Sequence, residues 1–167
     1  MKRLINIFII ATLTGAPLSV YGQRGADDDP VIRIFNRYED REGVESVTIS
    51  PALLGLRTND SRTQELISKI SGLRILSLTD RAGSSNRATR EALTAELQTV
   101  VRSDFEEIMM VRSAGERVEL YVRNRDGRGA LLFIVSGANS ITVMHLAGTI
   151  DKTLIDAVMS GEIGISN

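Results

Sequence analysis

The stretch from residue 105 to residue 150 constrains the fold more than any other part of the sequence. It consists of apolar runs separated by three polar clusters: Ala-Gly-Glu, Arg-Asp-Gly-Arg-Gly and Ser-Gly-Ala-Asn-Ser. Runs rich in β-branched residues between such clusters predict an antiparallel meander, and Asp126-Gly127 is a strong hairpin signal. Residues 130–135 are apolar at every position, which indicates a central strand. We therefore expect four meander strands here.

Capping signals upstream of the meander predict helices that alternate with two further strands. Asp29 followed by Pro30 is typical of a helix start, and Gly43 suits the end of that helix. The two predicted strands cover residues 44–50 and 73–79. Four more helices are predicted over residues 52–56, 61–72, 87–103 and 154–159.

These elements predict one α+β domain with a mostly antiparallel sheet. The sheet combines the C-terminal four-stranded meander with the two N-terminal strands, and the helices are expected to pack on one face. We place this domain at residues 30–160, between a polar lead-in at 23–29 and a loose tail at 161–167. A chain of 167 residues is long enough for one such domain.

Residues 1–22 have the pattern of a secretory signal peptide. Lys2 and Arg3 precede an apolar run at residues 4–13, and Gly22 suits cleavage before Gln23. The run is too short to cross a bilayer, so we expect no integral membrane span after cleavage. The sequence contains no Cys, so it lacks the modified cysteine of a lipoprotein. We expect a periplasmic or secreted protein.

Composition argues against several classes of function. The formal net charge is −1, which lacks the basic excess that nucleic-acid binding needs. The absence of Cys rules out thiol catalysis, and a single His argues against a histidine metal site. No pattern indicates a cofactor, and we assign no catalytic residue.

Alternation along residues 117–123 predicts the binding surface. Val118, Leu120 and Val122 alternate with polar residues, which implies one buried face and one wetter face of the sheet. The wetter face is the expected binding surface, and it carries Arg117, Glu119, Tyr121, Arg123 and His145. A lone His on a strand is more often part of a half-buried sheet surface than catalytic. The leading hypothesis is a non-enzymatic binding protein that engages another protein of the cell envelope.

The loop from Asp80 to Arg87 supports a different hypothesis. It joins a strand to a helix start, where free N–H groups favour anions. The candidate anion ligands are Arg81, Gly83, Ser84, Ser85 and Arg87. The spacing matches neither the P-loop nor the dinucleotide fingerprint, and an ordinary capped loop explains it more simply. The alternative function is a small hydrolase or an anion-binding or phosphate-binding protein.

Several segments resemble one known family. They are FNRYEDREGVESVTISPALLGL, ISKISGLRILSLTD, FEEIMMVRSAGERVELYVRNRDGRGALLFIVSG and VMHLAGTIDKTLID. The sequence is similar to the DUF4252 family, uncharacterised small exported proteins common in Bacteroidetes. The resemblance implies no catalytic or ligand residues. Family members often lie near genes for extracytoplasmic-function sigma factors and their anti-sigma partners, which implies a role in envelope stress or signalling.

Overall fold

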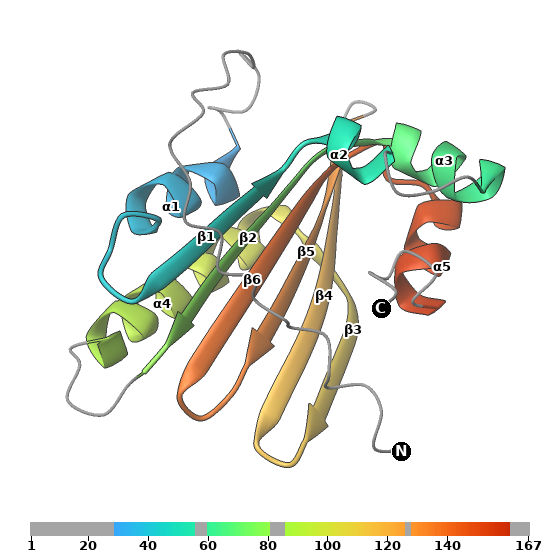
Figure 1. Cartoon of the computed structure of the whole chain (residues 1–167). Helices are drawn as coiled ribbons and strands as arrows, with labels where there is room; N and C mark the ends of the chain where they lie inside the picture. The colour runs from blue at the N-terminus through green and yellow to red at the C-terminus, as the bar shows by residue number, and fades with distance from the viewer. Residues whose placement is uncertain (1–28, 56–59, 81–85, 126–127, 161–167) are drawn as a thin grey trace.

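The computed structural model describes residues 29–55, 60–80, 86–125 and 128–160. The helices are α1 (Pro30–Tyr38), α2 (Pro51–Gly55), α3 (Ser61–Ser68), α4 (Asn86–Asp104) and α5 (Lys152–Ser160). The strands are β1 (Val44–Ile49), β2 (Ile70–Thr79), β3 (Glu106–Ser113), β4 (Glu116–Arg125), β5 (Arg128–Ser136) and β6 (Ser140–Gly148). They form one sheet in the order β1-β2-β6-β5-β4-β3, and every neighbouring pair is antiparallel (Figure 1).

The α+β class, the four-stranded meander and the two N-terminal strands are confirmed. One boundary differs, because β2 begins at Ile70 and the sequence pattern placed residues 70–72 in a helix. Ile70 pairs with Gly148 of β6, and the carbonyl of Lys69 accepts from the backbone N–H of Thr149 at 2.8 Å. This pairing starts the strand early. The predicted signal peptide, most of the lead-in, the tail and Asp126-Gly127 lie outside the described residues.

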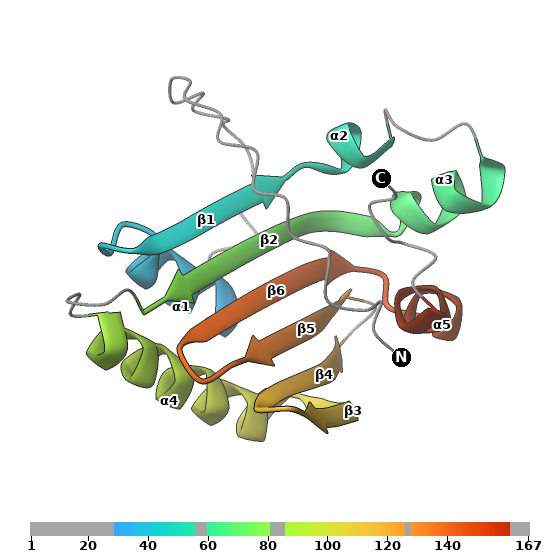
Figure 2. The same ribbon diagram turned by 60° about the horizontal axis from the view of Figure 1, so that its bottom comes forward.

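One face of the sheet, which we call the α4 face, is covered by α1 and α4. Its core contains Leu76, Leu78, Leu132, Ile141 and Val143 of the strands, with Phe35 of α1 and Leu93 and Leu97 of α4. The two helices pack side by side, and Glu96 of α4 accepts from Arg37 at 2.6 Å and from the Tyr38 hydroxyl at 2.9 Å. Figure 2 shows α4 running beneath the strands.

The opposite face, which we call the α5 face, carries a second core. Leu66 of α3 and Leu154 and Ala157 of α5 pack with Leu120, Leu131 and Leu146 of the sheet. The helices α3 and α5 lie at one end of the sheet (Figures 1 and 2). The expectation that all helices cover one face is therefore too simple, because Val118, Leu120 and Val122 form an apolar row that needs a cover of its own.

Candidate functional site

The face that the sequence pattern identified as wetter is the α4 face, and its central residues are buried. Glu119 is 6% exposed, Tyr121 7% and His145 1%. The prediction that they form an open surface is wrong. Alternation correctly separates the two faces of β4, but both faces are covered, and the polar groups are compensated by partners inside the fold. The five predicted binding residues fall into two groups.

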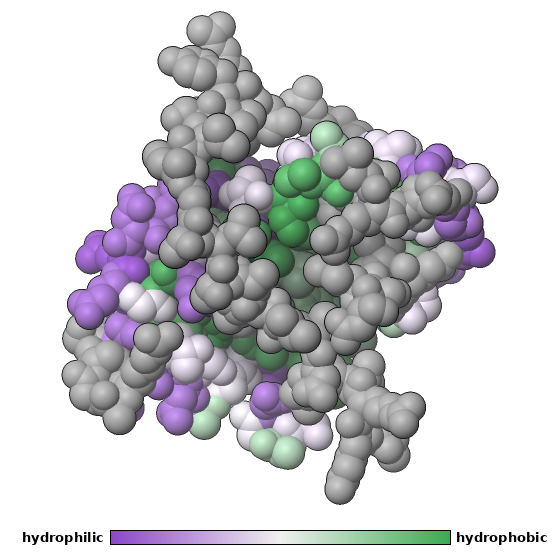
Figure 3. Space-filling model, in the orientation of Figure 1, coloured by the Kyte–Doolittle hydropathy of each residue, from purple (hydrophilic) through white to green (hydrophobic). Residues whose placement is uncertain are grey.

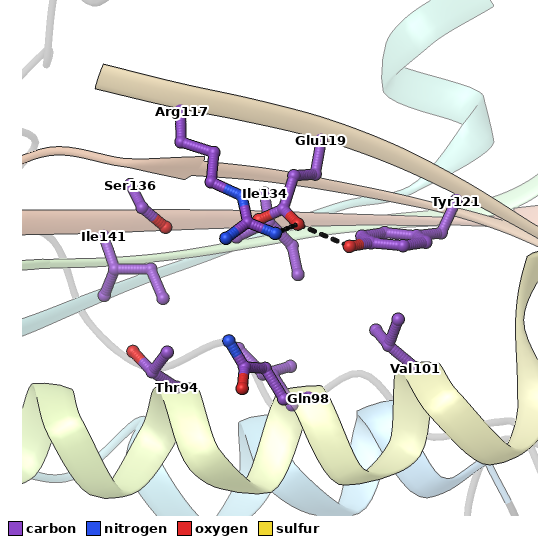
Figure 4. Close-up of a pocket in the computed structure, with 10 residues that line it drawn as sticks. Thr94, Gln98, Val101, Arg117, Glu119, Tyr121, Ile134, Ser136 and Ile141 are labelled. Atoms are coloured by element: carbon purple, nitrogen blue, oxygen red, sulfur yellow. Dashed lines mark hydrogen bonds and ion pairs between the residues drawn. The ribbon is translucent and has the colours of Figure 1, made fainter. Parts of the chain in front are cut away.

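The first group lines a cleft between α4 and β4 (Figure 4). Arg117, Glu119 and Tyr121 occupy alternate positions of β4, so their side chains point to the same side. The cleft has a volume of about 160 Å³. Its remaining lining comes from Thr94, Leu97, Gln98 and Val101 of α4 and from Ile134, Ser136 and Ile141 of β5 and β6. The sequence identified the β4 residues but gave no sign that α4 would face them.

Glu119 is the centre of the hydrogen bonds in this cleft. Its Oε1 accepts from Arg117 Nη2 and from the Tyr121 hydroxyl, both at 2.5 Å. Its Oε2 accepts no hydrogen bond from the described residues and is not fully enclosed. Burial, together with the hydrogen bond to Glu119, raises the pKa of Tyr121 to about 12. The phenol therefore stays protonated at neutral pH and acts as a donor to the carboxylate.

Arg117 lies at the mouth of the cleft. Its side chain is 36% exposed, and its buried Nε has no hydrogen-bond partner among the described residues. Figure 4 shows Arg117 and Glu119 side by side on β4, with Gln98 and Thr94 opposite them on α4. The cleft thus presents an accessible carboxylate oxygen beside guanidinium donors, above the apolar side chains of Leu97, Val101 and Ile134.

The second group is a cluster of Asp29, Arg123 and His145, in which His145 is buried and the other two are partly buried. Arg123 Nη2 pairs with Asp29 Oδ2, and His145 Nε2 lies 3.2 Å from the same oxygen. That contact is not aligned as a hydrogen bond, and neither imidazole nitrogen has a hydrogen-bond partner within the described part of the chain. The Asp29 Oδ1 also accepts from the N–H of Val31 at 2.9 Å, so Asp29 caps α1 as the sequence indicated. Its second role, as an ion-pair partner, had no sequence signal.

The electrostatics and burial of this cluster indicate that it stabilises the fold and does not bind a ligand. Burial raises the pKa of Asp29, but the adjacent His145 and Arg123 outweigh burial and hold that pKa well below its usual range. His145 also packs edge-on against the Phe35 ring of α1, with 6.4 Å between ring centroids. The cluster joins the start of α1 to β4 and β6, and its imidazole is too buried to meet a ligand.

The predicted anion loop is described only in part. Arg81, Gly83, Ser84 and Ser85 lie outside the described residues. Asp80 Oδ2 accepts from Arg90 at 2.9 Å and 3.1 Å, and Arg87 pairs with Glu91 at 2.8 Å. The charges of Asp80 and Arg87, the two charged loop residues that the structure describes, are thus compensated within the protein.

The described residues contain neither a cluster of metal-ligating side chains nor a membrane-spanning helix. No three of their His, Cys, Asp and Glu side chains are grouped so that they could hold a metal ion. Within the same ranges, none of the helices combines the length and apolarity required to cross a membrane.

Comparison with protein-family profiles gives a match over most of the chain. The sequence profile of a family described as "Domain of unknown function (DUF4252)" matches residues 38–158. The match includes all of β1 to β6, and hence every strand residue of the cleft. Asp29 precedes the matched segment. No protein of curated function matches the chain.

Proposed function

The chain belongs to the DUF4252 family, and from that premise we propose that it is an exported, non-enzymatic binding protein of the cell envelope. The cleft between α4 and β4 is the proposed binding site. The observation that carries the proposal is the placement of Glu119, a buried carboxylate held by Arg117 and Tyr121, with Oε2 left as an acceptor toward the cleft.

The arrangement favours binding over catalysis. Glu119 Oε1 already accepts two hydrogen bonds, and Tyr121 is committed to it as a donor. A general acid needs a proton that is free for the substrate, and the proton of Tyr121 is already donated to Glu119. The lone imidazole, which is the usual proton-transfer group near neutral pH, is 1% exposed and lies outside the cleft.

The chemistry of the cleft favours a ligand group with a donor next to an acceptor. Glu119 Oε2 requires an N–H or O–H, and the guanidinium of Arg117 requires a carbonyl or carboxylate oxygen. A carboxamide or a peptide group satisfies both. The apolar lining from Leu97, Val101 and Ile134 then receives the carbon atoms attached to it.

The size of the cleft favours a protein partner over a free metabolite. Pockets for small molecules usually measure roughly 300–1,000 Å³, whereas this cleft measures about 160 Å³. A cavity of about 150 Å³ holds one benzene-sized group. We therefore expect one side chain of another envelope protein to enter the cleft, while the surrounding surface supplies the rest of the contact.

The test blocks the cleft without removing any bond inside it. Gln98 is exposed on α4 and lines the cleft, so Gln98→Trp fills the cleft from the helix side. The matched control is Ala92→Trp, which places the same ring on an exposed position of α4 outside the cleft. After crosslinking in the native envelope, wild type and Ala92→Trp should capture the same partner and Gln98→Trp should not. Equal capture by all three proteins would exclude the cleft as the binding site.

The proposal of export rests on the signal-peptide pattern of residues 1–22. Cell fractionation should recover the protein in the periplasm or the medium, with Gln23 as the first residue of the mature chain by mass spectrometry. A cytoplasmic protein that retains Met1 would contradict this part of the proposal. The proposed link to envelope stress or sigma and anti-sigma signalling rests on the family resemblance. It is tested by deleting the gene and measuring an envelope-stress reporter.

A further inference from the structure

The two edge strands of the sheet differ in how they are protected. The sheet order leaves β1 at one edge and β3 at the other, and each edge strand presents N–H and C=O groups on its outer side. Every residue from Glu45 to Thr48 of β1 is exposed. Val47 has half of its surface exposed, at 50%, and Val111 on β3 is similar at 46%. The two edge strands therefore expose an apolar side chain to a similar extent.

β3 has the features that prevent edge-to-edge pairing. Its register with β4 shifts between Glu107 and Met109, so a bulge interrupts the strand. Charged residues lie along it at Glu106, Glu107 and Arg112. Bulges and charges are two of the devices by which natural sheets block their edges.

β1 lacks these features. It pairs with β2 in unbroken register from Val44 opposite Leu78 to Ile49 opposite Leu73. The strand VESVTI contains no Pro, Lys or Arg, and Glu45 is its single charge. Val, Thr and Ile are strong strand formers. A regular, exposed strand of this composition is a template for another strand.

We propose that β1 pairs antiparallel with β1 of a second copy of this chain, about a two-fold axis at Val47. Val47 then lies opposite the other Val47, Ser46 opposite Thr48 and Glu45 opposite Ile49. Both copies place Val47 on the α5 face, where Ile75 and Met144 continue the same row across β2 and β6. The two sheets become one, and the apolar row runs through the junction.

Charge distinguishes this arrangement from others. In the register centred on Val47, Glu45 faces an Ile, which avoids like-charge contact. A parallel in-register pair would instead place Glu45 beside Glu45, which is destabilising. Ser46 and Thr48 face each other on the other side of the junction, and hydroxyl pairs of this kind are favourable across strands. The sequence of β1 is therefore complementary to itself, which favours a second copy over an unrelated strand.

Figure 3 shows apolar surface over the middle of the face seen in Figure 1, with hydrophilic surface at both sides. Ile75, Met144 and Phe133 on that face are only partly buried. Pairing through β1 places the α5 faces of the two copies on the same side of the joined sheet.

The absence of Cys from the chain makes a specific crosslinking test possible. Directly opposite residues of an antiparallel pair have Cβ atoms about 4.5–5.5 Å apart, close to the separation of a disulfide. Val47→Cys should therefore give a disulfide-linked dimer on mild oxidation, even if the dimer is weak. Val111→Cys is the matched control, because it is similarly exposed on the protected edge, and it should remain monomeric.

A second pair of variants tests the register. Two copies of Glu45→Cys would hold their thiols four residues apart along the junction, about 13 Å, and should not crosslink. A mixture of Glu45→Cys with Ile49→Cys should give the heterodimer. Light scattering should find the wild type dimeric and Val47→Lys monomeric, with Val111→Lys unchanged from wild type. Equal crosslinking of Val47→Cys and Val111→Cys, or no crosslinking of Val47→Cys, would overturn the proposal. Crosslinking of Val47→Cys to a different envelope protein alone would overturn it in favour of a foreign strand.

Discussion

Replacement of Asp29 by Asn tests the cluster that joins α1 to the sheet. An amide still caps α1 well, so the substitution removes the charge that pairs with Arg123 and keeps the bond to Val31. Breaking a buried ion pair costs about 3–5 kcal/mol, because the remaining charge is left uncompensated. The Arg123 and Asp29 side chains are 14% and 13% exposed, so water relieves part of this cost. We expect a loss at the lower end, about 3 kcal/mol.

Chemical denaturation and thermal melting measure this loss. For a domain of this size, 1 kcal/mol corresponds to a change of about 2–4 °C in Tm, so we expect a decrease of about 6–12 °C. Asp60→Asn is the matched control, because Asp60 caps α3 from an exposed position, accepting from the Thr63 N–H at 2.8 Å. The free energy of unfolding of the Asp60→Asn variant should differ little from that of wild type. A loss below about 1 kcal/mol for Asp29→Asn would refute the assignment of the cluster as a buried ion pair.

The Asp29→Asn variant also tests how the free energy of unfolding depends on pH. The pKa of Asp29 in the folded protein lies below the ordinary value of 3.8, so the unfolded chain takes up the proton first as pH falls. The stabilisation from Asp29 is therefore complete above the unfolded pKa and decreases below it. The difference in unfolding free energy between wild type and Asp29→Asn should shrink below about pH 4. A difference that stays constant down to about pH 3 would contradict the lowered pKa.

Two further predictions concern the cleft and the end of β6. Tyr121→Phe removes a hydrogen bond to a buried carboxylate and should cost about 1–2 kcal/mol in urea denaturation; an unchanged midpoint would show that the bond contributes nothing. Gly148→Ala would place a Cβ 2.1 Å from the carbonyl oxygen of Lys69 and should cost about 1–3 kcal/mol or more. Gly72→Ala, where a Cβ meets nothing within 4 Å, is its control, and equal stability of the two variants would contradict the close approach.

The strands of this fold could be predicted from local sequence because their signals are local. Turn clusters separate the meander strands, and alternation along β4 assigns each residue to the correct side of the sheet. The position of β2 between β1 and β6 could not be predicted, since its partner Gly148 lies far from Ile70 in the chain. Pairings over such distances leave no local pattern.

The candidate site illustrates a different limit of prediction from sequence. Charged residues on a strand normally indicate solvent, and by that rule Glu119 and Arg123 belong to an open face. Glu119 is compensated by Arg117 and Tyr121 of its own strand. Arg123 instead pairs with Asp29, which is 94 residues away in the chain. Residue type reports the cost of burying a group, but only the fold shows whether that cost is compensated.

The position of the cleft follows from how α4 is packed. Glu96 bonds to α1 on one side of α4. Along the other side, where Thr94 and Gln98 lie, no helix of the described ranges packs. Six strands at about 4.8 Å each make the sheet about 29 Å wide, and two helices of about 10–12 Å diameter cover about 20–24 Å of that width. The part of the α4 face that neither helix covers lies on the β4 side. Apolar residues there would need a third helix to bury them, and the chain instead has Arg117 and Glu119 at these positions. A partner that inserts a side chain beside Gln98 would complete this helix layer. The sheet is wider than α1 and α4 together, and the strip that they leave uncovered is therefore available for binding.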